Sequence, residues 1–205
     1  MRKLLFLLVL SVLALHLNAQ VITETQARQR INAATAKMNS MQCNFVQTKY
    51  VSILNDKLVS KGRMYCSGTN KLRWEYTSPY AYTFLLNGAT VQMKNDRSTR
   101  QVNVGQNKMF GEITRIMMNS VTGKCLSNSK DFKVKLQCVQ GYWTALLTPH
   151  RKNLKQLFST VTLHFDKSWL VSKVILTEKD GNRTIISLRD VKLNQPINAK
   201  LFSLH

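Results

Sequence analysis

Tight-turn signals at near-regular intervals restrict the fold of this chain more than any other feature. Asn87-Gly88 and Asp180-Gly181 are each flanked by residues that alternate between apolar and polar. Asn-Gly and Asp-Gly favour the two-residue turns of β-hairpins, and alternation places apolar side chains on one face of a strand. Gln140-Gly141 and Asn55-Asp56 predict two further turns. The sequence therefore predicts an antiparallel, strongly curved β-sheet or barrel.

Strands are predicted along most of the chain on the same grounds. We expect them at residues 45–54, 58–65, 101–104, 169–177 and 183–188. Between these ranges, alternation predicts strands with one apolar face. The apolar sets are Leu72, Trp74 and Tyr76; Tyr82, Phe84 and Leu86; Val91 and Met93; Phe132, Val134, Leu136 and Cys138; Trp143, Ala145 and Leu147; and Val161, Leu163 and Phe165.

Two amphipathic helices accompany the strands and make the fold α+β. The first begins at Thr23, which forms a capping-box pattern with Gln26. The second ends near Gly123 and is too short to be stable alone, so its apolar stripe must cover something. The apolar faces are Ala27, Ile31, Ala34, Met38 and Met41 in the first helix, and Ile113, Ile116, Met117, Ser120 and Val121 in the second.

The N-terminus has the pattern of a cleaved secretory signal. A basic start precedes an apolar run from Leu4 to Leu15, and Ala19 offers a small residue at the cleavage point. The run is shorter than the roughly 20 apolar residues that span a bilayer, although an uncleaved anchor is the alternative. We expect removal of residues 1–19 and a single exported domain at residues 20–205.

The chain is strongly basic, with 30 Lys and Arg residues, 10 Asp and Glu residues and a net charge of +20. Loss of Arg2 and Lys3 with the signal lowers this charge by two, to +18. In an exported protein, such a charge favours anionic lipid headgroups and membrane surfaces over nucleic acid. The basic residues are spread along the chain, so a generally solvated basic surface is the alternative.

The four cysteines, Cys43, Cys66, Cys125 and Cys138, are compatible with disulfides in an exported protein. Cys43 and Cys66 straddle the predicted turn at Leu54-Asn55 almost symmetrically, as cross-strand partners would. We therefore expect Cys43–Cys66 to be the bond if one forms, with four buried thiols as the alternative. The sequence contains no CxxC, which argues against a redox motif or a zinc knuckle.

The sequence lacks the motifs of common catalytic sites. His150 and His164, the internal histidines after the signal, do not have metal-ligand spacing. There is no GxSxG, no HExxH and no phosphate-binding glycine loop. Most acidic residues fall at predicted turns or strand ends, where solvated carboxylates are ordinary. We therefore expect no enzyme activity, no metal and no cofactor.

Several short motifs follow one another in an order found in a known family. They are Phe45-x-Gln47-x-Lys49, Gly62-Arg63-Met64-Tyr65, Leu72-Arg73-Trp74-Glu75-Tyr76 with Pro79, Leu147-Thr148-Pro149, Asn153-Leu154-Lys155-Gln156, Asn194 and Phe202. In this order the chain resembles LolA, the family of periplasmic outer-membrane lipoprotein carriers. The resemblance covers essentially the whole chain after the signal.

The resemblance implies an unclosed half-barrel, an antiparallel sheet whose concave face is covered by helices. It also implies a periplasmic shuttle that takes lipoprotein acyl chains from an inner-membrane release complex to an outer-membrane acceptor. We expect this carrier to be a monomer without nucleic-acid partners. The second helix would be the lid, through Ile113, Ile116 and Met117. Better-studied members latch the lid with an arginine where this chain has Gly68, so the resemblance does not extend to that latch.

An apolar cavity of this kind would be lined by side chains at the inward strand positions. Met and aromatic residues suit adaptable lipid sites, whereas a filled core is the alternative at each position. Two other functions stay open: an envelope binding or sensor module of the same fold, and a carrier of anionic glycolipid or phospholipid. The expected lining is Phe45, Met64, Trp74, Tyr76, Phe84, Leu86, Met93, Val134, Trp143, Leu147, Val161 and Leu163.

Overall fold

One antiparallel sheet of eleven strands dominates the described part of the chain. The computed structural model describes residues 22–54, 56–104, 106, 115–116, 118–119, 122, 124–126 and 130–203. The strands are arranged in the order β6-β5-β4-β3-β2-β1-β11-β10-β9-β8-β7. They are β1 (Ser40–Val51), β2 (Asp56–Ser67), β3 (Lys71–Ser78), β4 (Tyr82–Asn87), β5 (Thr90–Asn95), β6 (Thr99–Asn103), β7 (Phe132–Val139), β8 (Tyr142–Pro149), β9 (Thr160–Phe165), β10 (Val171–Thr177) and β11 (Arg183–Leu193).

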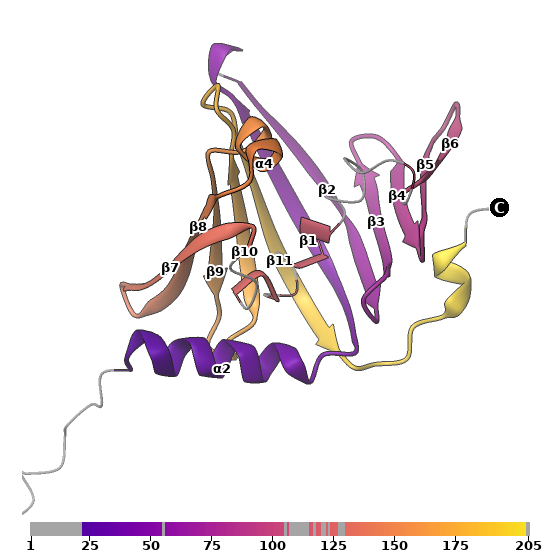
Figure 1. The fold of residues 1–205 in the computed structure, drawn as a ribbon. Coiled ribbons are helices and arrows are strands. Elements are labelled where there is room, and N and C mark those ends of the chain that lie inside the picture. Colours follow the sequence, from indigo (N-terminus) through magenta and orange to yellow (C-terminus); the bar gives the residue numbers. More distant parts are fainter. Residues whose placement is uncertain are drawn as a thin grey trace, which may run out of the picture.

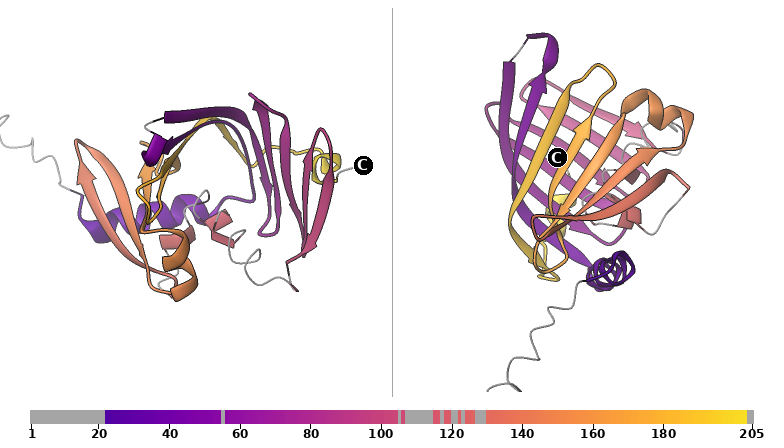
Figure 2. Two further views of the ribbon diagram at one scale, coloured as in Figure 1. Left: turned by 90° about the horizontal axis from the view of Figure 1, so that it is seen from above. Right: turned by 90° about the vertical axis from the view of Figure 1, so that its left-hand side faces the viewer.

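The sheet is strongly curved and open. β6 and β7 are its two edges, and every neighbouring pair between them is antiparallel. Viewed from above, the sheet forms an arch with a concave side (Figure 2). The predicted α+β fold with an unclosed, strongly curved antiparallel sheet is confirmed.

The predicted glycine turns join consecutive strands. Gly88 and Gly181 have φ of 63° and 84°, in the region that glycine enters without steric cost. Gln140 and Gly141 have φ of 52° and 79°, so both central residues of the β7–β8 turn are left-handed, as a type I′ hairpin requires. Asn55 lies outside the described residues, and a short 3-10 turn, η1 (Ser52–Leu54), follows β1.

Helix α2 (Glu24–Ala36) begins where the sequence predicts. The backbone N–H of Gln26 donates to Thr23 Oγ1 over 3.2 Å, and the Thr23 N–H donates to Gln26 Oε1 over 2.9 Å. Ala27 and Ile31 are fully buried. The helix runs across the lower end of the sheet (Figure 1).

The end of α2 differs from the prediction. The apolar spacing extends the helical face to Met38 and Met41, but the helix ends at Ala36 and Met41 is part of β1. Asn194 causes this early end, because its Oδ1 accepts from the Asn39 N–H over 2.8 Å and its Nδ2 donates to the Lys37 carbonyl over 2.9 Å. Met41 is nonetheless buried, on a strand rather than a helix.

Part of the second predicted helix is described. Residues 115, 116, 118, 119 and 122 are helical, and η2 (Lys124–Leu126) follows. Ile116, Met118 and Leu126 are buried in the main apolar cluster. The helical pieces of this part of the chain lie at the open side of the arch (Figure 2). Ile113 and Met117 lie outside the described residues.

Two short helices were not predicted. Helix α4 (Lys152–Leu157) connects β8 to β9 and buries Leu154. The 3-10 turn η3 (Ala199–Phe202) packs on the convex side, where Asn87 Nδ2 donates to the Phe202 carbonyl over 3.1 Å. Phe202 and Leu85 of β4 are both buried, so β4 has apolar contacts on both of its faces. Among the described residues, no helix has the length and apolar character needed to cross a membrane.

Candidate functional site

The concave face of the sheet brings together all twelve predicted lining residues. They belong to one continuous apolar cluster. Tyr76, Phe84, Met93, Val134 and Trp143 are half-buried at its margins. The other members are buried, namely Phe45, Met64, Trp74, Leu86, Leu147, Val161 and Leu163.

The strand register explains why these side chains meet. Met64 of β2 faces Trp74 of β3, Trp74 faces Phe84 of β4, and Phe84 faces Met93 of β5. Directly opposed residues on antiparallel strands share one face of the sheet. This row therefore forms one wall of the arch, from the middle of the sheet toward the β6 edge.

A second row forms the opposite wall. Val134 of β7 faces Leu147 of β8, Leu147 faces Val161 of β9, and Val161 faces Leu176 of β10. The predicted alternation is correct along these strands. At the far end of β7 the alternation does not predict burial correctly, since Cys138 occupies an apolar position of the pattern but is exposed.

An aromatic group lies at the centre of the concave face. The Phe45 ring centroid lies 4.7 Å from that of Trp74 and 5.2 Å from that of Tyr76, the latter pair edge to face. Gly62, opposite Phe45 in the register, makes room for this packing. A Cβ at Gly62 would lie 2.6 Å from Phe45 Cζ and 1.9 Å from the Glu75 carbonyl oxygen. Only glycine fits there.

Two polar groups lie within this aromatic group. The Tyr76 hydroxyl donates to Gln47 Oε1 over 3.0 Å, and burial raises the pKa of Tyr76. Trp74 is buried, and its Nε1 donor has no hydrogen-bond partner among the described residues. The concave face is therefore apolar, with few polar groups.

The helical residues 115–116 and 118–119 are tied to the sheet by an ion-pair cluster that the sequence did not predict. Asp131, at the start of β7, pairs with Arg115 of that segment and with Arg151 next to α4, the latter over 3.4 Å. Burial alone would raise the pKa of Asp131, but the hydrogen bonds and charges of the two arginines hold it below its usual value. The partners are 16 and 20 residues from Asp131, which is why local sequence patterns do not reveal them.

Gly68, which stands where the family's latch arginine would be, lies in an open turn. It has a φ of +60° in the β2–β3 turn, and a Cβ added there would have no neighbouring atom within 4 Å. The nearest basic residues make other contacts. Arg73 pairs with Glu75 over 3.0 Å and donates to the Leu201 carbonyl, while Lys71 lies 6.0 Å from the Phe202 ring centroid on the convex side.

Cys43 and Cys66, the pair expected to bond if a disulfide forms, are not directly opposed across the two strands. Both side chains are buried free thiols. The register places Cys43 opposite Met64 and Cys66 opposite Met41, so the two cysteines are diagonal neighbours offset by two residues. Burial raises the pKa of each thiol to about 12.

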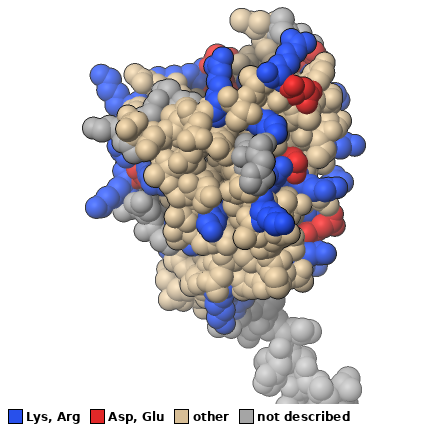
Figure 3. All heavy atoms as spheres, turned by 90° about the vertical axis from the view of Figure 1, so that its right-hand side faces the viewer, with Lys and Arg blue, Asp and Glu red and all other residues tan. Residues whose placement is uncertain are grey.

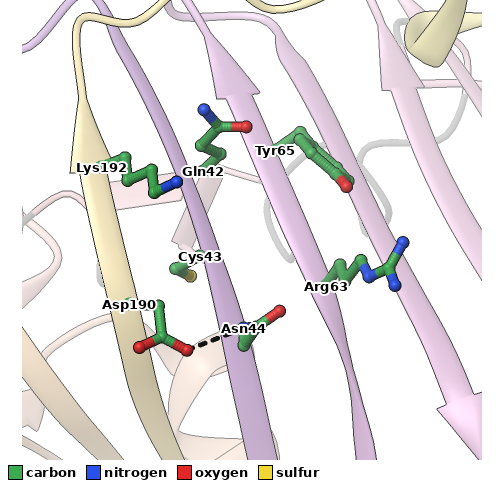
Figure 4. A pocket seen from close by; sticks show the side chains of 7 residues that line it. All are labelled: Gln42, Cys43, Asn44, Arg63, Tyr65, Asp190 and Lys192. Carbon is green, nitrogen blue, oxygen red and sulfur yellow. Dashed lines mark hydrogen bonds between the residues drawn. The ribbon is translucent and has the colours of Figure 1, made fainter.

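Among the described residues, one groove lies on the convex side and another borders the concave face. The larger, of about 480 Å³, is on the convex side beside a bulge in β11, where Asp190 and Val191 lie opposite Cys43. Asn44 Nδ2 donates to Asp190 Oδ2 there over 2.8 Å (Figure 4). Its lining, Gln42, Cys43, Asn44, Arg63, Tyr65, Asp190 and Lys192, is polar and charged. Such a surface does not suit an acyl chain.

The second groove, of about 210 Å³, lies between the β7–β8 turn and the β9–β10 connection and includes Trp143. Nearby, the Arg30 guanidinium of α2 lies 5.2 Å from the Trp169 ring centroid. Among the described residues, no group of three His, Cys, Asp or Glu side chains is placed to hold a metal ion.

Comparisons with known proteins define the family. The model of the family described as outer membrane lipoprotein carrier protein LolA matches residues 36–205, so the chain belongs to the LolA family. The family is one of carriers rather than enzymes, which agrees with the lack of catalytic motifs.

Curated relatives carry the same description. An outer-membrane lipoprotein carrier protein from Nitrosomonas europaea is 26% identical over 203 residues, covering 98% of this chain and 94% of the relative. One from Chromohalobacter salexigens is 25% identical over 191 residues, covering 93% of this chain and 87% of the relative.

Solved structures are similar at lower identity. A LolA superfamily protein from Nitrosomonas europaea has a TM-score of 0.49 at 12% identity, with 90% of this chain and 99% of that chain covered. A putative outer-membrane lipoprotein-sorting protein domain from Vibrio parahaemolyticus has a TM-score of 0.48 at 10% identity, with 86% and 94% covered.

Proposed function

We propose that the protein is a periplasmic carrier that binds the acyl chains of lipoproteins on the concave face and shuttles them from the inner to the outer membrane. Residues 1–19 direct export and are removed, and residues 20–205 form the carrier domain. The donor is an inner-membrane release complex and the acceptor lies at the outer membrane, as the carrier description of the family suggests.

The observation that carries this proposal is the apolar concave face. Its buried centre at Phe45 and Trp74 is flanked by the half-buried side chains of Tyr76, Phe84 and Met93, which still offer apolar surface. Each buried methylene contributes about 0.8 kcal/mol, so one long acyl chain gains roughly 10 kcal/mol before ordering costs. Binding of that strength needs no external energy source, and a lid that opens allows release.

The segment that contains the helical residues 115–116 and 118–119 acts as this lid. Ile116 and Met118 pack on the apolar cluster, and Arg115 holds the segment to Asp131. Entry of an acyl chain requires these side chains to move aside, so cargo competes with the lid for the same apolar surface. Ile113 and Met117 belong to the same proposed lid.

Native mass spectrometry of the protein isolated from a periplasmic extract tests the proposal. We expect a chain that lacks residues 1–19 and carries a non-covalent adduct with the mass of an acylated lipoprotein or lipid. The adduct should disappear in the Met93→Glu variant and persist in the Val139→Glu variant, whose substitution lies on an exposed residue outside the cluster. A protein without adduct under gentle ionisation contradicts the proposal.

The net charge favours one second candidate. At +18 after loss of the signal, the protein suits an anionic glycolipid or phospholipid as cargo. The same spectra distinguish the two, because a phospholipid or glycolipid adduct is far lighter than a lipoprotein. An adduct of an intact, non-acylated protein would instead indicate a binding or sensor module.

A further inference from the structure

Exposed apolar side chains gather at the end of the β1–β2 hairpin. Ile53 in η1 is 92% exposed, and Leu58, Val59 and Tyr50 are 54%, 41% and 37% exposed. We call these four residues the hairpin tip. Large apolar side chains exposed singly are ordinary, but four on one projecting element form a surface that water does not favour.

The hairpin tip projects beyond its neighbours on one side. β2 pairs with β3 only from Lys61 onward, so residues 56–60 have no partner strand on that edge. The tip stands at the upper end of the molecule, opposite α2 (Figure 1). Tyr80, 78% exposed in the β3–β4 connection, lies at the same end.

Basic side chains surround the hairpin tip. The Arg183 guanidinium lies 5.2 Å from the Tyr50 ring centroid, and Lys49 Nζ lies 3.8 Å from Glu178 Oε1. Lys and Arg side chains (blue) are spread widely over the face of the molecule shown in Figure 3, and Asp and Glu side chains (red) occupy smaller areas of it. The charged residues of the tip and the adjacent β10–β11 turn are Lys49, Lys57, Lys61, Lys179 and Arg183 against Asp56, Glu178 and Asp180.

We propose that the hairpin tip inserts into the interface of an anionic phospholipid bilayer and docks the carrier on the membrane. Two interactions bind a peripheral protein to a bilayer. Apolar side chains enter the boundary between headgroups and acyl chains, and neighbouring lysines attract the anionic headgroups. The net charge of +18 after loss of the signal adds attraction over the whole surface. The biological purpose of this docking rests on the proposed carrier function, but docking itself does not require bound cargo.

Flotation of the exported chain with vesicles tests this docking. Vesicles of phosphatidylglycerol and phosphatidylcholine in equal parts should bind the protein, and vesicles of phosphatidylcholine alone should bind it at least tenfold more weakly. Raising NaCl from 0.1 to 0.5 M should weaken binding several-fold, because salt screens the attraction to the headgroups.

Two variants and a matched control locate the contact. Val59→Glu should weaken vesicle binding at least tenfold, and Ile53→Ser, which changes no charge, should weaken it several-fold. Val139→Glu is the control, because Val139 is a 48% exposed strand residue at a hairpin on the opposite end of the sheet. It should change binding by less than twofold.

Three results overturn the inference. The first is that the wild-type protein does not bind anionic vesicles. The second is that Val59→Glu and Val139→Glu weaken vesicle binding equally. The third is that the wild-type protein binds an envelope protein through the hairpin tip and does not bind vesicles. Acyl-probe binding by each variant separates this inference from the carrier function. Val59→Glu should bind the probe as wild type does, so a failure of docking leaves the carrier proposal standing, and the reverse also holds.

Discussion

Gly62 shows how one residue shapes the concave face. Glycine at this position lets the Phe45 ring lie against β2, where it meets Trp74 and Tyr76. Its backbone is ordinary strand, so the requirement is for space rather than for left-handed φ. The Gly-led motif of the family resemblance thus has a packing reason in this chain.

Replacing Gly62 by alanine should destabilise the protein by about 1–3 kcal/mol, because the new methyl group overlaps Phe45 and the Glu75 carbonyl. Urea unfolding followed by tryptophan fluorescence measures the change. The control is Gly68→Asn, at a left-handed turn with open space, where we expect a loss below about 1 kcal/mol. Equal stability of Gly62→Ala and wild type would show that Phe45 does not pack on Gly62.

The buried thiols should be nearly inert at neutral pH. Burial raises the pKa of Cys43 and Cys66 to about 12, whereas Cys138 is exposed. In a Cys125→Ser background, iodoacetamide at pH 8 should alkylate Cys138 first and the other two only after unfolding, as read by peptide mass spectrometry. Rapid labelling of Cys43 in the folded protein would contradict its burial.

The same thiols give stability a pH dependence with a definite sign. Their folded-state pKa lies above the ordinary thiol value of 9.0, so the folded protein favours the protonated form. This contribution is complete below pH 9 and is lost as the pH rises from about 9 to about 12. Urea midpoints should therefore fall faster above pH 9 in wild type than in a Cys43→Ala, Cys66→Ala double variant.

At the scale of elements, the lid segment depends on Asp131. Asp131→Asn should destabilise the protein by about 1–2 kcal/mol, a discounted figure because both arginine partners are partly exposed. Hydrogen exchange at residues 115–116 and 118–119 should increase. The matched control is Glu24→Gln, which breaks the exposed Glu24–Arg28 pair of α2 and should cost at most about 0.5 kcal/mol.

The pH dependence of this cluster has the opposite sign to that of the thiols. The folded-state pKa of Asp131 lies below the ordinary carboxyl value of 3.8, so the ion pairs stabilise the fold at all pH values above about 4. That contribution is lost as the pH falls through the folded-state pKa.

Hydrogen exchange also gives the result that would contradict the role of Asp131. If exchange at residues 115–116 and 118–119 is the same in Asp131→Asn as in wild type, the segment is held by its apolar contacts alone.

The elements also show what sequence can and cannot predict. The start of α2 was predictable because Thr23 and Gln26 interact across three residues. Its end was not, because Asn194 sets it from 155 residues away. Burial of Leu85 was missed for the same reason, since the distant C-terminal turn η3 packs on β4. The two-residue offset between Cys43 and Cys66 could not be predicted, because symmetric spacing about a turn does not fix the register of β1 and β2 to the residue.

At the scale of the whole molecule, alternation predicted which side chains share one apolar cluster. Period-two patterns in single strands identify the inward side chains, and antiparallel pairing then brings them onto one face whatever the order of the strands. The curvature that makes this face concave, and the ion pairs that hold the lid, depend on contacts between distant segments. Local sequence patterns do not reveal such contacts, so they could not be predicted from the sequence.

The proposed carrier function also predicts that a charge added to the concave face weakens the binding of an acyl chain. Met93 is half-buried at the margin of the apolar cluster, where a charge can be added without disturbing the core. Met93→Glu should weaken binding of an acyl chain at least tenfold, or about 1.4 kcal/mol, with a circular dichroism spectrum near that of wild type. Leu163→Glu should also reduce binding, while Met93→Leu should stay within about threefold of wild type.

Titration of the protein with a fluorescent fatty-acyl probe, followed by displacement with a triacylated peptide, tests the carrier function most directly. We expect saturable binding, complete displacement by the triacylated peptide, and no displacement by the same peptide without acyl chains. The apolar concave face between Trp74, Phe84 and Met93 is the physical reason for this expectation. A correctly folded protein that binds no probe would show that the concave face is a filled core, and the protein would not be an acyl-chain carrier.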